Sequence, residues 1–307
     1  MSAVLGELFY WIFNMSIIAS LMGLIVLPIR SIRVLPRRLA VLLWVVPFLR
    51  MLLPVGFNSP YSLMTLVSRF TTRSVTVYQP AEDISFSLTN FVMAANSYFP
   101  ITYRVKLLDN IFAAAALIWM IVALAILVAL GILYFSTLKE MKKAKHLRDN
   151  IYLAENIQGP AVYGIWKPRI ILPASYANKE LQYILKHEAT HIRRWDNLWR
   201  MLAFFTGAVH WFNPLAWLFL KRFLSDIELA CDEAAIAKYG REQRQAYARA
   251  LVDCAESKSL FISAFGGARI RTRIEHILSY KRMTVFSLIG FFALIVSIVF
   301  ALLTNAG

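Results

Sequence analysis

The sequence predicts a mainly α-helical protein with two parts: a bundle of four transmembrane helices, and a helical domain that contains a small β-hairpin or sheet. Three observations predict this fold class. The 307-residue chain is 59% hydrophobic and has a mean hydropathy of +0.56, which is too apolar for an ordinary soluble domain. Several of its apolar stretches are long enough to cross a bilayer, which needs about 20 residues. Lysine and arginine gather at alternate ends of these stretches.

Three of the apolar stretches contain no Asp, Glu, Lys or Arg, and they predict the first, third and fourth transmembrane helices: Leu8–Ile29, Ile111–Phe135 and Met283–Thr304. The stretch Leu39–Phe57 is shorter and carries Arg50, and it predicts the second helix. Because a charge is costly in lipid, Arg50 is expected to snorkel outward or to pair within the bundle. The N-terminus lacks a basic n-region and its apolar run is too long for a signal peptide, so we interpret it as a retained transmembrane helix.

The positions of lysine and arginine predict the orientation. These residues are dense in the loop 30–38, directly after the third span and directly before the fourth, and they are sparse in the loop 58–110. By the positive-inside rule, both termini and the loop 58–110 then lie outside the cell. The expected parts are residues 1–135 with three helices and an extracellular loop, a cytosolic domain over 136–282, and the fourth helix over 283–307. This predicts a multi-pass plasma-membrane protein whose basic groups hold the cytosolic domain against anionic lipid.

Charge and cysteine content narrow the functional class. The formal net charge of +15 is concentrated in the segments that flank the membrane spans, and no nucleic-acid-binding module is recognisable, so direct binding of nucleic acid is not expected. The two cysteines, Cys231 and Cys254, fall in the predicted cytosolic domain, where reducing conditions disfavour a disulfide. Cys231, next to the candidate metal site, is expected to pack there rather than to act as a metal ligand.

The first half of the predicted cytosolic domain has two local features. The charged segment 139–150 is interpreted as helical. Between Pro160 and Pro173, proline and glycine separate two short β-prone runs, which predicts a small hairpin. Two interpretations of the hairpin carry equal weight: it is purely structural, or it offers an edge strand that pairs with an extended peptide. In the second interpretation, the strand that binds the peptide consists of Tyr163, Gly164, Ile165 and Trp166.

The most specific signal is the run His187-Glu188-Ala189-Thr190-His191, which lies in an apolar, helix-compatible stretch. Residues four apart on a helix share one face, with Cβ atoms roughly 5–6 Å apart, so both imidazoles can bind one Zn²⁺. Glu188 then lies beside the metal, where it can take a proton from a water that the metal activates. This pattern is typical of zinc peptidases. A chance match is the alternative, but two of only five histidines fall in this run.

A helical hairpin brings a third ligand to the two histidines. Gly207 is expected to end the helix that carries the motif, and Asn213-Pro214 is a start signal for the next helix. Residues 198–220 therefore predict a hairpin that dips into the membrane interface and returns. The two arms measure about 24 Å and about 21 Å, which places Glu228 level with the histidines.

These residues together predict a catalytic zinc site. Catalytic zinc has three protein ligands and one open position, so the assigned ligands are His187, His191 and Glu228, and Glu188 is assigned as the general base. Zinc-bound imidazoles usually donate their second N–H to a carboxylate. Asp232 is favoured for this role over a solvated charge, and the two interpretations of Asp196 are even. Arg273 is either a surface charge or a contact near the site, again with equal weight.

Several segments resemble one known family. The pattern HExxHIRRxD at 187–196, the run HWFNPLAW at 210–217 and the run ELACDEAA at 228–235 are similar to the integral-membrane zinc metallopeptidases of the BlaR/MecR type. These are the beta-lactam sensor-transducers and their shorter relatives. The run AVYGIWKPRIILP at 161–173 also resembles theirs, and the resemblance covers about residues 1–300. It implies that the cytosolic domain is a gluzincin-like zinc peptidase domain, and it matches the ligands and the general base assigned above.

The resemblance also implies a function. It points to a membrane zinc metalloendopeptidase that acts at the cytoplasmic face in antibiotic-resistance signalling, by cleaving itself, a transcriptional repressor, or both. The expected partners are a protein substrate and membrane lipid, and a homo-oligomer is left open. Two alternatives remain: a quality-control peptidase similar to Ste24 and HtpX, and a non-catalytic regulatory membrane receptor. In the sensor-transducers an extracellular penicillin-binding domain follows the last span, about where this sequence ends at Gly307. A stand-alone relative and a truncated transducer both fit this departure.

Overall fold

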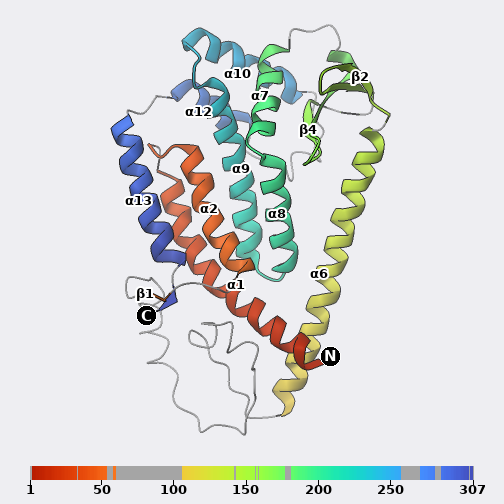
Figure 1. Cartoon of the computed structure of the whole chain (residues 1–307), viewed down its shortest axis with the longest axis vertical. Coiled ribbons are helices and arrows are strands. Elements are labelled where there is room, and N and C mark those ends of the chain that lie inside the picture. Colours follow the sequence, from red (N-terminus) through yellow and green to blue (C-terminus); the bar gives the residue numbers. More distant parts are fainter. Residues whose placement is uncertain are drawn as a thin grey trace.

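The computed structural model describes most of the chain outside the expected extracellular loop. The described residues are 2–32, 34–53, 58–59, 106–141, 143–155, 157, 159–176, 181–256, 270–280, 285–303 and 305–306. Over these residues the protein is mainly helical and contains one small mixed sheet, as the sequence predicts (Figure 1). Most of the predicted loop 58–110 lies outside the described residues.

The described residues include four apolar helices: α1 (Ser2–Arg30), α2 (Arg37–Leu52), α6 (Lys106–Met141) and α13 (Val285–Leu303). In Figure 1, the starts of α1 and α6 reach the end of the molecule that holds the N-terminus. The four helices coincide with the four predicted spans. By length and composition, two of them can cross a membrane, over Val4–Arg30 and Ile111–Lys139. The apolar part of α13 is shorter, at Ile289–Leu302.

Between α6 and α13, the described residues contain five further helices: α7 (Gln182–Arg193), α8 (Asp196–Val209), α9 (Pro214–Ile236), α10 (Arg241–Glu256) and α12 (Ile270–Ser279). Helices α7, α10 and α12 gather around the C-terminal half of α9 at the opposite end from the N-terminus (Figure 1). Helix α8 and the first half of α9 form a hairpin that reaches down beside α2 (Figure 1).

The sheet lies beside α7. Its order is β2-β3-β5-β4, with β3 and β5 parallel and the two outer strands antiparallel to their neighbours. The strands are β2 (Lys145–Arg148), β3 (Ile151–Ala154), β4 (Ala161–Tyr163) and β5 (Arg169–Pro173). The pair β4–β5 is the predicted hairpin, and β4 lies at one edge of the sheet. A 3₁₀ turn (Ala174–Tyr176) follows β5, and a short parallel pair joins β1 (Asn58–Ser59) to β6 (Asn305–Ala306).

The prediction of a helix over 139–150 is wrong beyond Met141, where α6 ends. The next residues form β2, which turns back into β3 through Asp149 and Asn150. Asp149 has a φ of 45°, in the left-handed region. Asp and Asn tolerate this region and favour two-residue hairpin turns. Turn chemistry and pairing with β3 therefore outweigh the helix-compatible composition of the segment.

The helix with the His-Glu-x-x-His run is also shorter than expected. Helix α7 ends at Arg193, and α8 starts after Trp195, whose φ of 57° interrupts the helix. Gly207 does not end the second segment, because α8 continues to Val209. A Cβ at Gly207 would lie 3.4 Å from the Leu220 side chain on α9, an ordinary van der Waals contact, so Gly207 lies within α8 where this helix faces α9.

The turn from α8 to α9 is held by other helices. The predicted start of α9 is confirmed: Pro214 is its first residue, and the Asn213 side chain accepts a hydrogen bond from the backbone N–H of Leu215 at 2.9 Å. The Asn213 amide also donates to Ser16 Oγ of α1 at 2.8 Å. Trp119 of α6 donates its indole N–H to the carbonyl of Val209 at 2.8 Å. The tip of the hairpin is thus bound to two of the apolar helices.

Gly23 allows α1 to pack closely on α9, and its substitution gives a test of this packing. A Cβ at Gly23 would overlap the buried ring of Phe219, which also packs against Trp44 with ring centroids 5.5 Å apart. We expect Gly23→Ala to lower the free energy of unfolding by about 1–3 kcal/mol, because overpacking forces side chains or backbone to shift. Denaturation in detergent measures the loss. Gly6→Ala on the same helix, with nothing within 4 Å, is the matched control, and equal stability of the two variants would contradict the packing described.

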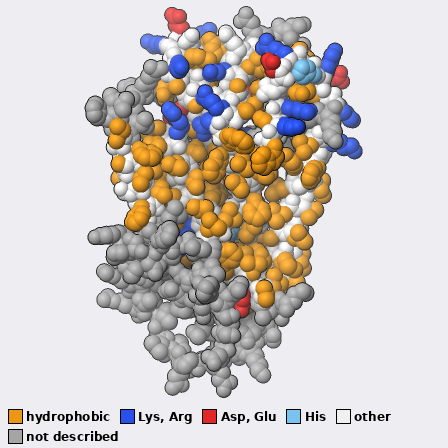
Figure 2. Space-filling model, in the orientation of Figure 1, with side chains coloured by type: hydrophobic (Ala, Val, Ile, Leu, Met, Phe, Trp, Pro, Cys, Tyr) orange, Lys and Arg blue, Asp and Glu red, His pale blue; other side chains and the backbone are white. Residues whose placement is uncertain are grey.

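The surface has an apolar region and a basic region. Figure 2 shows hydrophobic side chains over the middle of the molecule and lysines and arginines around the end that holds α7 and the sheet. The large exposed apolar side chains include those on α6, α8 and α13, among them Ile121, Leu124, Met201, Phe205, Ile289 and Phe292. Apolar side chains around the middle and basic side chains at one end are typical of a protein that lies partly in a membrane.

Candidate metal centre

Helix α7 presents two histidines on its buried face. His187 and His191 are each 5% exposed, and their Nε2 atoms lie 3.0 Å apart. The spacing of four residues places both imidazoles on the side of α7 that packs against α9. Two imidazole nitrogens therefore point at one place between these helices.

Helix α9 places Glu228 opposite the two histidines. One carboxylate oxygen lies 3.7 Å from Nε2 of His187, and the other lies 3.7 Å from Nε2 of His191. A tetrahedral zinc with ligand bonds of about 2.0–2.1 Å needs ligand atoms roughly 3.3 Å apart. The separations of 3.0, 3.7 and 3.7 Å lie on both sides of this value. Because the two 3.7 Å contacts involve different oxygens of Glu228, the donor set fits a metal ion that both oxygens bind, or that one oxygen binds after a small turn of the carboxylate.

Cys231 offers a second set of donors with the same histidines. Its Sγ and a ring nitrogen of each histidine lie within 4.8 Å of one another. However, Sγ contacts Nδ1 of His187 at 3.6 Å and the His187 carbonyl at 3.5 Å, on the side away from Nε2. Glu228 has an oxygen 3.7 Å from each Nε2, so the carboxylate and the thiol are both candidates for a third ligand.

The Nδ1 atoms of both histidines meet polar groups that orient the rings. Nδ1 of His191 lies 2.6 Å from Oδ2 of Asp196, the first residue of α8. Nδ1 of His187 lies 2.8 Å from the Tyr247 hydroxyl, which donates to Asp232 Oδ1 at 2.8 Å. With Nδ1–H donating in each ring, the Nε2 lone pairs face the centre between α7 and α9.

Two arginines contact Glu228. Arg273 of α12 is buried and donates through Nε and Nη2 to both oxygens of Asp232 at 2.8 Å. Its Nη1 lies 3.3 Å from Glu228 Oε2, and its Nη2 lies 3.2 Å from Nε2 of His187. Arg200 of α8 donates to the other oxygen, Oε1. A metal bound at His187 requires Nη2 of Arg273 to move away from Nε2, and the same Nη2 donates to Asp232 Oδ1 at 2.8 Å.

The charges around Glu228 and Asp232 keep both carboxyl groups ionised. Burial alone would raise the pKa of Glu228, but Arg273, His191 and Arg200 hold this pKa well below its ordinary value. Asp232 is buried too, and its pair with Arg273 lowers its pKa strongly. Burial lowers the pKa of His191, whereas Cys231, Glu228 and the hydrogen bond with Asp196 raise it, and the result is about 9. A metal must therefore displace a proton from this imidazole.

Glu188 lies next to His187 on α7 and is only 8% exposed. Within the described part of the chain, its carboxylate makes no hydrogen bond or ion pair. Its oxygens are thus available to accept a proton, unlike those of Glu228, Asp232 and Asp196.

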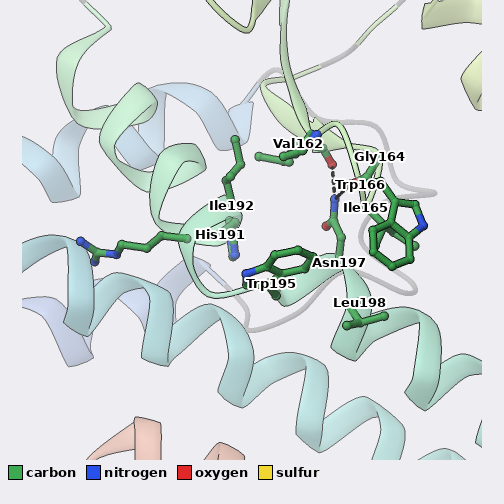
Figure 3. A pocket seen from close by; sticks show the side chains of 11 residues that line it. Val162, Gly164, Ile165, Trp166, His191, Ile192, Trp195, Asn197 and Leu198 are labelled. Atoms are coloured by element: carbon green, nitrogen blue, oxygen red, sulfur yellow. Dashed lines mark hydrogen bonds between the residues drawn. The ribbon is translucent and has the colours of Figure 1, made fainter.

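A cavity of about 270 Å³ extends from His191 to the edge strand β4 (Figure 3). In Figure 3, Trp195 lies between His191 and Asn197. The Asn197 amide donates to the backbone carbonyls of Val162 and Gly164, both at 3.1 Å. The predicted peptide-binding residues Tyr163, Gly164, Ile165 and Trp166 thus lie along or directly after this edge, three of them lining the cavity, and the Trp166 side chain is 86% exposed.

The sequence missed two contributors to the centre, Arg200 and Tyr247. Arg200 lies nine residues after His191, and Tyr247 comes from α10, so neither has a helical spacing to the motif. Cys231 packs beside the site, as the sequence predicts, and it is buried against His187. For Arg273 the sequence allows a surface charge or a contact near the site; its side chain is buried, and Nη2 lies 3.2 Å from Nε2 of His187. These contacts depend on tertiary packing of α8, α10 and α12 on α9.

Asp196 gives a testable effect on metal affinity. We expect Asp196→Asn to weaken Zn²⁺ binding by about 10–100-fold, because the carboxylate orients His191 and makes its ring more basic. Competition with a chromogenic chelator measures the change. Asp253→Asn, at an exposed position of α10, is the matched control. Equal affinity of the Asp196 variant and the wild type would mean that the 2.6 Å contact does not support a metal ligand.

The comparisons with known proteins identify the class to which this fold and centre belong. The model of the family described as BlaR1 peptidase M56 matches residues 10–277, so the chain belongs to this peptidase family. The resemblance to the BlaR/MecR type is thereby confirmed. A methicillin resistance mecR1 protein of Staphylococcus aureus is 27% identical over 150 residues, which is 45% of this chain and 25% of that protein. The regulatory protein BlaR1 of Bacillus licheniformis is 27% identical over 124 residues, which is 39% of this chain and 21% of that protein.

Proposed function

We propose that the protein is a zinc metalloendopeptidase embedded in the plasma membrane, with its active site at the cytoplasmic face. The convergence of His187, His191 and Glu228 between α7 and α9, with Glu188 beside them, carries the proposal. Membership of a peptidase family and two helices able to cross a membrane support it.

The residues of the centre have different roles in the proposed reaction. His187, His191 and Glu228 would hold Zn²⁺, which when bound polarises the scissile carbonyl and lowers the pKa of water. Glu188 is the general base: it accepts the proton of the attacking water and later delivers it to the leaving amine. Asp196 orients His191, and Tyr247 with Asp232 orients His187. Arg273 holds Asp232 in place and, with Arg200, keeps Glu228 ionised.

The substrate is an extended peptide that lies along β4. This strand is at the edge of the sheet, and the cavity beside it ends at His191, so a peptide there would pass the metal ligands. The carbonyls of Val162 and Gly164 already accept from Asn197, so a peptide must share these acceptors or displace the amide. The hydrogen bonds from Asn197 to Val162 and Gly164 are equally compatible with a hairpin that has only a structural role.

The biological role is regulatory proteolysis. The matched relatives are named for methicillin resistance and for regulation, and the chain covers 25% and 21% of the lengths of the two described above. We propose that the protein cleaves a transcriptional repressor, itself, or both. Its four apolar helices would span the membrane with both termini outside and the basic end of Figure 2 inside.

The test uses the full chain, purified in detergent and incubated with candidate repressor proteins. We expect one or a few cleavage sites, read by mass spectrometry of the products, with activity lost on chelation and restored by Zn²⁺. Broad cleavage of unfolded proteins would indicate quality control instead. Bound zinc without turnover of any substrate, including the chain itself, would indicate a regulatory receptor.

A further inference from the structure

Two carboxylates of α9 do not belong to the candidate metal centre. Asp226 and Glu233 are 0% and 5% exposed, and their spacing of seven residues places them on one face of the helix, two turns apart. Glu228 follows Asp226 by two residues, or about 200° of rotation, so it lies on the opposite side. One side of α9 therefore contacts the two histidines, and the other contacts α1 and α2.

Asp226 joins the ends of α1 and α2 to α9. Arg30, the last residue of α1, donates through Nε at 2.6 Å and through Nη2 at 2.7 Å to the two oxygens of Asp226. Trp44 of α2 donates its indole N–H to the same carboxylate at 2.8 Å. A two-bond guanidinium–carboxylate pair is directional, so it sets the position of α9 relative to α1.

Glu233 caps the start of α2. Its Oε2 accepts the backbone N–H of Arg37 at 2.9 Å, where Pro36 provides no side-chain cap. The Arg37 guanidinium in turn donates to the Arg30 carbonyl at 2.8 Å, at the end of α1. Glu233 also lies 3.3 Å from Nε2 of His276, on the helix that carries Arg273. We call Arg30, Arg37, Trp44, Asp226 and Glu233 the α1–α2 clasp.

We propose that the α1–α2 clasp positions Glu228 and Asp232 for metal binding, which makes Asp226 and Glu233 positioning residues; this inference rests on the proposed function. Buried ion pairs add little net stability, because desolvation offsets most of their attraction, but their geometry is specific. Glu228 is two residues from one end of the clasp, and Asp232 is one residue from the other. A shift of the joined ends of α1 and α2 would thus move the proposed metal ligand Glu228 and the His187 partner Asp232 together.

This arrangement connects the apolar helices to the metal centre. Helices α1 and α2 lie among the apolar helices, and their joined ends are bound to the helix that carries Glu228 (Figure 1). Any event that displaces α1 against α2 would change the metal site through α9, with no contact to the site itself. The clasp therefore offers a route by which the membrane part of the chain sets metal affinity.

The test measures Co²⁺ binding by the full chain in detergent, with and without the clasp. Co²⁺ replaces Zn²⁺ in tetrahedral sites, and its visible absorption reports the geometry of the ligands. We expect Asp226→Asn and Glu233→Gln to weaken Co²⁺ affinity by about tenfold, the lower end of the range for groups that support ligands, and to alter the spectrum. Phe48→Leu is the control: Phe48 packs on Phe223 of α9 with centroids 5.2 Å apart, so it changes stability at the same interface without a polar contact.

The outcomes separate the two proposals. Clasp variants that are less stable but match the wild type in Co²⁺ affinity and spectrum would overturn this inference and leave the proposed function intact. A wild type that binds no Co²⁺ would overturn both. If Asp226→Asn does not fold, Trp44→Phe removes one hydrogen bond from Asp226 and keeps an aromatic ring. A smaller shift in the same direction supports the inference, and an unchanged spectrum and affinity overturns it.

Discussion

Glu188→Gln is expected to abolish peptide cleavage while the protein still binds its metal. The amide keeps the size of the side chain but cannot accept the proton of the attacking water, and general-base catalysis contributes roughly 10²–10⁴-fold to such reactions. Glu188 makes no polar contact within the described residues, so its replacement should leave the fold and the three proposed ligands in place. Product formation and zinc content, measured on the same preparation, test both parts of this expectation.

The control for this prediction is Glu242→Gln, at an exposed position of α10. It should cleave at the wild-type rate and carry the same amount of zinc. If Glu188→Gln still cleaves itself or a co-expressed repressor, Glu188 is not the general base. If the variant loses both zinc and activity, Glu188 supports the site rather than the chemistry.

Glu228→Gln should lose most of its metal. An amide oxygen is a weaker ligand than a carboxylate, and the change leaves Arg200 and Arg273 beside the site without the negative charge that both now contact. Both effects oppose the binding of a cation. The loss in affinity should exceed the 10–100-fold that is typical for groups one step removed from a metal. Zinc content after dialysis, together with chelator competition, measures it.

Two further variants make this prediction specific. Glu275→Gln, in an exposed pair with Arg271 on α12, should bind zinc like the wild type. Cys231→Ser should also retain zinc, because Sγ faces Nδ1 and the carbonyl of His187. If Cys231→Ser loses zinc and Glu228→Gln retains it, the third ligand is Cys231 and not Glu228.

The sequence predicts much of this fold because its strongest signals are local. The apolar stretches coincide with α1, α2, α6 and α13, and the pair Asn213-Pro214 marks the start of α9. The two histidines share a face of α7 because a spacing of four residues requires it. The lengths of the two arms of the helical hairpin then place Glu228 level with the histidines. This calculation takes the first arm as one continuous helix, whereas the structure has a break at Trp195.

The rest could not be predicted because it depends on contacts between distant segments. Nothing local indicates that Arg200 or Tyr247 approaches the histidines, or that Asp226 and Glu233 bind the ends of α1 and α2. The strand β2 was missed for a different reason. Its charged composition suits a helix, and only the turn at Asp149 and the partner strand β3 decide otherwise.

X-ray absorption at the zinc edge of the loaded, purified protein would test the central claim most directly. Ligation by two imidazoles, Glu228 and water would give a first coordination sphere of nitrogen and oxygen alone, at about 2.0–2.1 Å, together with the outer scattering of two imidazole rings. Glu228→Gln should change this spectrum, whereas Cys231→Ser should not. A sulfur ligand at about 2.3 Å, or imidazole scattering from fewer than two rings, would contradict the centre described between α7 and α9.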